Sequence, residues 1–118
     1  MARPQKCRCI CSKPETTVFI PEGGSGENCV NLTYDEYETV RLLDFVCLTQ
    51  EQCARKMDIS RPTVTRIYNG ARQKIADALV NGRGITISGG DVVVCEEMRP
   101  ECVNEKYCFH RQQKNQQA

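Results

Sequence analysis

The chain has 118 residues, a formal net charge of +1 at pH 7 and 26% charged residues, which fits one domain with a modest core. No apolar run approaches the roughly 18 residues of a membrane span. The basic start, MARPQKCRCIC, has no apolar stretch behind it that would form a secretory signal. We therefore expect a cytoplasmic protein that does not enter a membrane.

The first predicted elements are a strand and a helix. TTVFI, residues 16–20, reads as a short strand, and PEGGSGEN after it reads as a loop. Thr33 can cap the first helix, and Glu36 three residues later completes a capping box. The helix should end near Cys47. By helical spacing, its core-facing positions are Tyr37, Val40, Leu43 or Phe45, and Val46.

A short helix, a tight corner and a long helix follow. Thr49 can cap the short helix with Gln52 as its capping-box partner, and the helix should stop at Asp58-Ile59. Ser60 can cap the long helix, and Asn81-Gly82 signals its end. The positions expected to pack inward on the long helix are Val64, Ile67, Tyr68, Ala71, Ile75, Ala78 and Leu79.

Two short strands are predicted after the long helix. Residues 84–88 alternate and read as a strand, which Gly89-Gly90 breaks. Residues 91–94 read as another strand, which could pair with residues 16–20. We therefore predict a mainly α fold, in which a core of three helices has short flanking β-strands.

The front of the long helix is cationic, and residues 59–76 contain no acidic residue. Two helices joined by such a short corner are typical of a helix-turn-helix, whose second helix enters the major groove of DNA. Arg can bond guanine at two points, Asn can do the same with adenine, and Thr can meet a thymine methyl or a phosphate. The candidate DNA-binding residues of this helix are Arg61, Pro62, Thr63, Thr65, Arg66 and Asn69, with Arg72 and Lys74 toward the phosphate backbone.

Other interpretations of these charges stay open. An amphipathic helical hairpin with a solvated charged face is the alternative to DNA binding, although such faces usually mix Glu with Lys. At the N-terminus, Arg3, Lys6 and Arg8 could form an extended arm along the minor groove or the phosphate backbone. They could equally belong to a disordered terminus that happens to be basic.

The first helix is acidic instead. Its charged residues should form a solvated face, which could alternatively dock a protein of the transcription machinery. These residues are Asp35, Glu36, Glu38 and Asp44.

Nine cysteines are present. Cys47 and Cys53 occupy apolar helix positions and should be buried. A tetrahedral zinc ion takes four ligands and an iron–sulfur cluster mostly thiolates, and both are open here beside reduced thiols or a disulfide. The candidate ligands near the C-terminus are Cys95, Cys102, Cys108 and His110. Cys7 or Cys11 could supply a further ligand if a strand brings the two ends of the chain together.

Three segments, LTYDEYETVRLLD, LTQEQCARKMDISRPTVTRI and ARQKIADALVNG, resemble a small prokaryotic family of predicted DNA-binding proteins, the domain of unknown function 134. Its helix-turn-helix is similar to region 4 of bacterial sigma factors. The start of the chain also matches, so the resemblance covers residues 1 to about 90. It implies a three-helix DNA-binding core, a role in transcription and no enzyme activity. Asp58 stands at the corner position where the family often has Gly, and residues after Gly90 depart from its usual pattern.

These patterns divide the chain into a basic, cysteine-containing arm (1–15), a helix-turn-helix domain with flanking strands (16–90) and a cysteine-rich tail (91–118). We expect a sequence-specific transcriptional regulator that binds double-stranded DNA as a homodimer or higher oligomer. The alternatives are a zinc- or iron–sulfur-dependent sensor and a protein-interaction module of the transcription machinery. An enzyme is not expected, because the chain has one His, no Gly-rich phosphate loop and no nucleophile with a base nearby.

Overall fold

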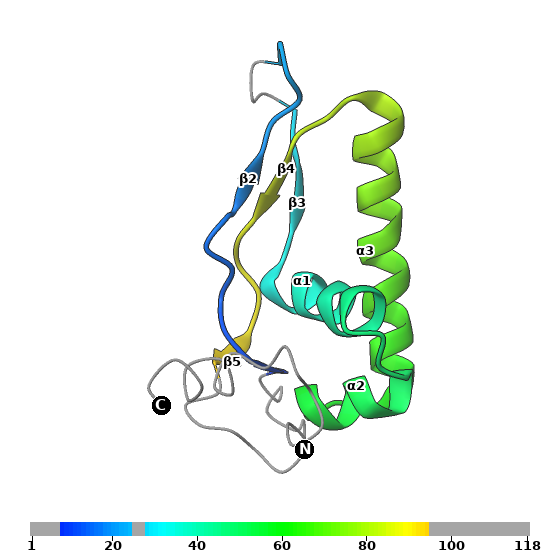
Figure 1. The fold of residues 1–118 in the computed structure, drawn as a ribbon. Helices are drawn as coiled ribbons and strands as arrows, with labels where there is room; N and C mark the ends of the chain where they lie inside the picture. Colours follow the sequence, from blue (N-terminus) through cyan, green and yellow to red (C-terminus); the bar gives the residue numbers. More distant parts are fainter. Residues whose placement is uncertain (1–7, 25–27, 95–118) are drawn as a thin grey trace, which may run out of the picture.

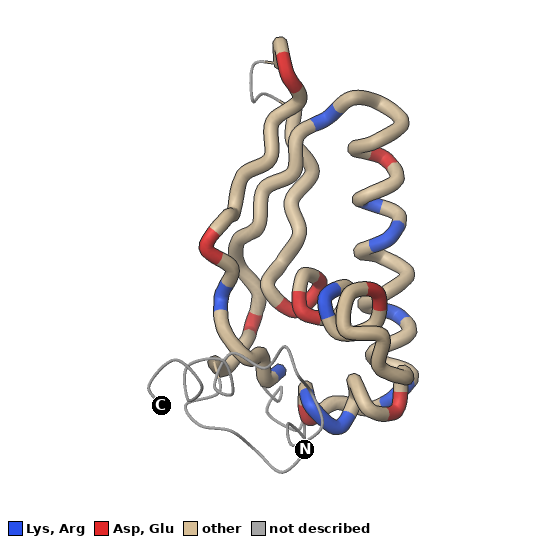
Figure 2. The backbone as a smooth tube through the Cα atoms, viewed as in Figure 1, with Lys and Arg blue, Asp and Glu red and all other residues tan. Residues whose placement is uncertain are grey.

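A computed structural model describes residues 8–24 and 28–94, and Figures 1 and 2 show the path of the chain. The helices are α1 (Tyr34–Val40), its π-helical continuation η1 (Arg41–Phe45), α2 (Gln50–Met57) and α3 (Arg61–Asn81). The strands are β1 (Arg8–Ile10), β2 (Val18–Phe19), β3 (Val30–Leu32), β4 (Ile85–Ile87) and β5 (Val92–Val94). About half of the described residues are helical, which agrees with the predicted mainly α class.

The helices begin and end where their local signals predict. The backbone N–H of Thr33 donates to Oε1 of Glu36 at 2.9 Å before α1. Oγ1 of Thr49 accepts from the N–H of Gln52 at 3.1 Å before α2. Asp58 closes α2 in the left-handed conformation with φ 58°, which Asp tolerates better than most residues. Ser60 caps α3, and Gly82 ends it with φ 65°.

The first helix departs from prediction in its last turn, which is π-helical. A π turn widens the helix and breaks the 3.6-residue period. Leu42, which the helical spacing did not select, is therefore fully buried. Phe45, one of the two predicted core positions there, is 64% exposed, whereas Leu43 packs against the core.

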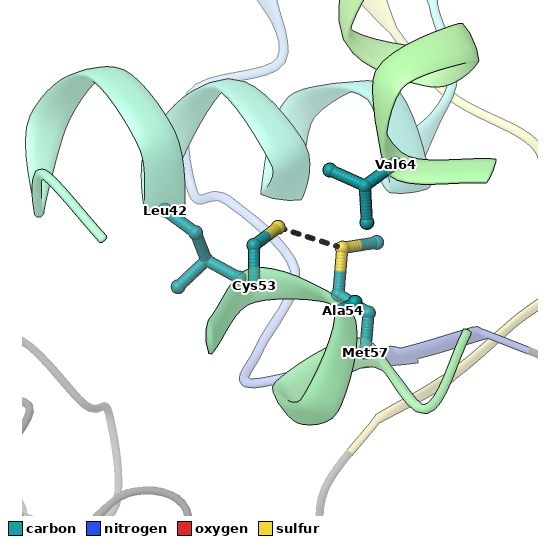
Figure 3. Packing of buried hydrophobic residues seen from close by; sticks show 5 residues of the cluster. All are labelled: Leu42, Cys53, Ala54, Met57 and Val64. Carbon is teal, nitrogen blue, oxygen red and sulfur yellow. Dashed lines mark hydrogen bonds between the residues drawn. The ribbon is translucent and has the colours of Figure 1, made fainter. Parts of the chain in front are cut away.

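One core lies where η1, α2 and α3 meet. Figure 3 shows its residues, Leu42, Cys53, Ala54, Met57 and Val64. The Cys53 thiol donates to the Met57 sulfur at 3.8 Å, and Cys53 is buried as predicted. The same prediction for Cys47 is wrong. Cys47 is exposed and left-handed (φ 68°), because the chain leaves the helix there instead of continuing along its inner face.

A second core joins α3 to the three-stranded sheet. Leu32 of β3, Ala71 of α3 and Ile87 of β4 are its buried members. The apolar stripe of α3 is mostly covered as predicted, with two exceptions. Tyr68 is only half-buried and donates its hydroxyl to Asp44 at the surface, and Leu79 is 77% exposed. For Leu79 the reason is visible in Figure 1, where the last turns of α3 extend beyond α1 and α2 and have only the sheet beside them.

Five strands form two small sheets in the described residues. In the larger sheet β4 is central, antiparallel to β2 on one side and parallel to β3 on the other. The other sheet is the parallel pair β1–β5. The predicted strands at 16–20, 84–88 and 91–94 contain β2, β4 and β5. The suggested pairing of 91–94 with 16–20 is wrong, because β5 pairs with β1 and β2 pairs with β4.

The β1–β5 pair joins the described ends of the chain. Arg8 lies opposite Val92, and Ile10 lies opposite Val94. Strand β1 belongs to the predicted N-terminal arm and β5 to the predicted tail, so part of the arm is packed on the helices and part of the tail is paired with it. Among the described residues, none of the helices combines the length and apolarity that crossing a bilayer requires.

Candidate nucleic-acid interface

The first turns of α3 present cationic and polar side chains to solvent. Arg61, Pro62, Arg66 and Asn69 are all exposed. Within residues 8–24 and 28–94, the side chains of Arg61, Arg66 and Asn69 have no hydrogen-bonding or ionic partner. Their donors are therefore available to an external acceptor.

The two threonines predicted to bind DNA form hydrogen bonds with neighbouring side chains instead of facing solvent freely. The hydroxyl of Thr63 lies 2.7 Å from that of the capping residue Ser60. The hydroxyl of Thr65 donates to the side-chain amide oxygen of Gln50, the first residue of α2. Both contacts fix the start of α3: the first holds its cap and the second ties it to α2.

Arg72 and Lys74 differ in what they contact. The Arg72 guanidinium is exposed and lies 5.1 Å from the centre of the Tyr68 ring, one helical turn earlier. The Lys74 ammonium instead turns inward. It donates to Oε1 of Glu36 at 2.7 Å and to the backbone oxygen of Asn31 at 2.9 Å.

The acidic residues of α1 are buried, which sequence reasoning missed. Asp35, Glu36 and Glu38 have relative exposures of 4%, 9% and 1%. The prediction of a solvated acidic face is therefore wrong for these three residues. Only Asp44 remains exposed, and its carboxylate accepts a hydrogen bond from the Tyr68 hydroxyl at 2.7 Å. The acidic surface suggested for docking a partner protein is correspondingly reduced.

Each buried carboxylate has its own cation at hydrogen-bonding distance. Arg8 Nη1 lies 2.6 Å from Asp35, Lys74 Nζ 2.7 Å from Glu36, and Arg41 Nε 2.7 Å from Glu38. Burial alone would lower the pKa of Arg41, but the hydrogen bond and negative charge of Glu38 raise this pKa above its ordinary value. The pairs compensate the charge that α1 brings into the interior.

Negative and positive charges therefore lie in different parts of the fold. The carboxylates of α1 are neutralised inside the fold, whereas the cations at the start of α3 are not matched by neighbouring acids. Figure 2 shows Lys and Arg recurring along α3, whose one acidic residue, Asp77, lies near its far end. The resulting surface attracts an anion to the N-terminal half of α3.

The predicted N-terminal arm is only partly within the described residues. Arg3 and Lys6 lie outside them. Arg8 lies on β1, and its guanidinium is already bound to Asp35. We infer that Arg8 anchors the arm to α1.

The β1–β5 pair brings the described start of the chain beside its described end. Cys11, just after β1, is buried, and its N–H donates to Oε2 of Glu38 at 2.7 Å. Ile10 and Val94 lie opposite each other, and the residues that directly follow them in sequence are Cys11 and Cys95. The other candidate ligands, Cys7, Cys102, Cys108 and His110, lie outside the described residues, as does Cys95. Within the described part, no three Cys, His, Asp or Glu side chains are grouped to hold a metal ion.

Two further residues contribute to this surface and were not selected from the sequence. Gln50 positions Thr65, and Tyr68 stacks on Arg72 while binding Asp44. The Tyr68–Arg72 contact has a sequence signal, because residues four apart are neighbours on a helix. The Gln50 contact has no such signal, because it depends on how α2 packs on α3.

Fold and surface define a small, mainly α protein with two short sheets and an exposed basic helix start. The chain belongs to the DUF134 family, whose model, described as "Protein of unknown function DUF134", matches residues 1–95. This confirms the family membership predicted from the sequence.

Curated relatives extend over most of the chain. A UPF0251 protein of Desulfitobacterium hafniense strain Y51 is 41% identical over 116 residues, which cover 97% of this chain and 91% of the relative. A UPF0251 protein of Thermoanaerobacter sp. strain X514 is 52% identical over 99 residues, 82% of this chain and 88% of the relative. No solved structure matches the chain.

Proposed function

We propose that the protein is a sequence-specific DNA-binding transcriptional regulator in which α2 and α3 form a sigma region-4-like helix-turn-helix. The supporting observation is the sorting of charge described above. Arg61 and Arg66 are exposed and without partners among the described residues. The acids of α1 are instead neutralised internally by Arg8, Arg41 and Lys74. Such an arrangement suits a phosphate-rich partner at the start of α3.

The geometry of the two helices is compatible with this role. A three-residue corner, 58–60, joins α2 to α3. Gln50 fixes the α3 surface through Thr65, so the recognition helix is held against α2. The N-terminus of α3, capped by Ser60, also presents backbone N–H groups that favour phosphate.

Individual roles follow from side-chain chemistry. We assign base contacts in the major groove to Arg61, Arg66 and Asn69, because their donors match guanine and adenine edges. Arg72 is assigned to the phosphate backbone, which positions the protein without reading sequence. Lys74 and Arg8 are assigned to the fold, since their charges are used internally.

A random-sequence selection tests the proposal. The purified full chain is incubated with a pool of random double-stranded DNA, and bound molecules are amplified over several rounds and sequenced. We expect enrichment of a defined motif, and no enrichment for the Arg61→Ala/Arg66→Ala variant. Lys13→Ala, which removes an exposed positive charge that lies over the Tyr34 ring and outside α3, is the matched control and should enrich the wild-type motif. Failure of the wild-type chain to enrich any motif would contradict sequence-specific binding.

A metal- or redox-responsive regulator is the second candidate, and the β1–β5 pairing favours it. This pairing places the residue before Cys11 opposite the residue before Cys95, so it joins the two cysteine-containing segments. Zinc and iron–sulfur clusters both take thiolate ligands. Elemental and sulfide analysis after anaerobic purification should find a stoichiometric metal in the wild-type chain and less in Cys11→Ala. A metal-free chain with the same DNA affinity would exclude this candidate.

A further inference from the structure

An apolar groove lies between the larger sheet and the C-terminal half of α3, away from the basic surface. It consists of two adjoining hollows of about 560 and 330 Å³. Phe19 of β2 and Ile85 of β4 line both, Ile75 lines the first, and Leu79 lines the second. The described chain leaves this groove open although its walls are mostly apolar.

Large apolar side chains protrude at the same place. Phe19 and Ile20 are 52% and 43% exposed, and Leu79 is 77% exposed; all three line the second hollow. Strand β2 is also an edge strand, so on its outer side it has no pairing strand among the described residues. Exposed apolar clusters and open edges of this kind mark surfaces that another chain covers.

We infer that a second copy of this chain covers the groove, and that the β2 edge and the C-terminal half of α3 form a two-fold homodimer interface. Two-fold interfaces require one patch that is complementary to itself. This face has both a protruding side chain and a hollow to receive it, because Leu79 protrudes beside a hollow lined by Ile75 and Ile85. Leu79 of each protomer would enter the groove of the other.

The charges at the rim and the size of the patch fit the same occupant. Asp77 and Arg83 form a half-buried ion pair at 3.3 Å beside the groove, so a two-fold axis can bring opposite charges together. The protruding side chains offer on the order of 300–500 Å² of apolar surface. A standard interface takes roughly 800 Å² from each partner. The apolar patch alone therefore supplies about half of one partner's share, and the β2 edge adds backbone groups for pairing.

The position of the groove leaves the proposed DNA surface free. Helix α3 has 21 residues, so its two ends are separated by roughly 30 Å at about 1.5 Å per residue. A dimer joined at the far end keeps both Arg61-bearing ends accessible for two half-sites. This last argument alone rests on the proposed function; the apolar surface does not depend on it.

Sedimentation equilibrium of the full chain, without DNA, tests the inference. We expect the wild-type chain to have twice the chain mass at tens of micromolar and Leu79→Lys to dissociate at least tenfold more readily. Because Leu79 is mostly exposed in one protomer, the variant should keep the wild-type helical circular dichroism spectrum. Phe19→Lys, on the opposite wall of the groove, is a second variant with the same expected result.

Phe45→Lys is the matched control, since Phe45 is also a large exposed side chain but lies on η1, outside the groove. It should leave the dimer intact. A monomeric wild-type chain, a dimer that survives both Leu79→Lys and Phe19→Lys, or equal dissociation by Phe45→Lys would overturn the inference. A dimer that binds no DNA would contradict the proposed function and leave this interface standing.

Discussion

The Lys74 ammonium lies 2.7 Å from Oε1 of Glu36, and this contact holds α3 against α1. The same ammonium donates to the backbone oxygen of Asn31 ahead of α1. A cation on the proposed recognition helix is thus part of the internal structure. Arg72, which stacks on Tyr68 at the surface, remains available for the proposed contact with DNA.

Replacing Lys74 distinguishes a role in stability from a role in DNA binding. We expect Lys74→Met to lower the free energy of unfolding by about 1–2 kcal/mol, because Glu36 loses its cation in a mostly buried position. DNA affinity should stay near the wild-type value. Urea denaturation and fluorescence anisotropy with a labelled duplex measure the two quantities.

Arg72→Met is the control with the opposite expectation. Its unfolding free energy should change by no more than about 0.5 kcal/mol, because Arg72 is exposed, while its DNA affinity falls several-fold. The assignment of Lys74 is wrong if Lys74→Met weakens DNA binding as much as Arg72→Met and leaves stability unchanged.

The Arg41–Glu38 pair is the most deeply buried ion pair in the described structure, with side chains 15% and 1% exposed. We expect Arg41→Met to destabilise the fold by about 3–5 kcal/mol, because an uncompensated carboxylate stays inside. In the Arg41→Met/Glu38→Gln double variant the charge is gone, and the amide oxygen can still accept from the Cys11 N–H. The double variant should therefore be more stable than Arg41→Met in urea denaturation. Additive losses from the two substitutions would show that the charges are not coupled.

The buried Cys53 thiol predicts a loss of stability at alkaline pH. Burial raises the pKa of Cys53 from 9.0 to about 12, with a smaller contribution from Glu38. Between these values the unfolded chain has lost the proton and the folded chain retains it, so stability falls as pH rises through this window. The slope from this group is on the order of 1 kcal/mol per pH unit.

Thermal denaturation between pH 8 and 11 measures this slope. Cys53→Ala should start from a lower midpoint, because core packing is lost, but its midpoint should fall less steeply with pH. Parallel slopes for Cys53→Ala and the wild-type chain would show that Cys53 does not cause the alkaline loss.

Cys47 and Cys53 should differ strongly in reactivity, because only the thiolate reacts and access is required. Cys47 is exposed, whereas Cys53 is 0% exposed and has a raised pKa. At pH 8, iodoacetamide should modify Cys47 long before Cys53, as followed by peptide mass spectrometry. In concentrated guanidinium chloride the two rates should become similar. Equal rates in the native protein would contradict the burial of Cys53.

The helix boundaries could be predicted because their signals lie within a few residues. Thr33 with Glu36, and Thr49 with Gln52, satisfy backbone groups three positions apart, and both capping boxes form. Strands β1 and β3 gave no such signal. Each has three residues and is stabilised by a partner far along the chain, which a local pattern does not contain.

The exposed face of α3 could be predicted for the same local reason. The cations that bind inside the fold instead of facing solvent could not. Exposure of Arg61 and Arg66 follows from the position of the apolar stripe of the helix. The inward turn of Lys74 and the anchoring of Arg8 depend on carboxylates 38 and 27 residues away. Burial of Asp35 and Glu36 was missed because those distant cations compensate their charges; Glu38 is instead paired with Arg41, three residues along the same helix.

The affinity of the full chain for its selected duplex tests the central claim most directly. Measured by anisotropy at several salt concentrations, affinity should fall steeply with salt, and Arg61→Ala and Arg66→Ala should each weaken it by about 1–3 kcal/mol. Lys13→Ala should leave it near the wild-type value. If both α3 variants bind the duplex as tightly as the wild-type chain, the start of α3 is not the DNA-binding surface.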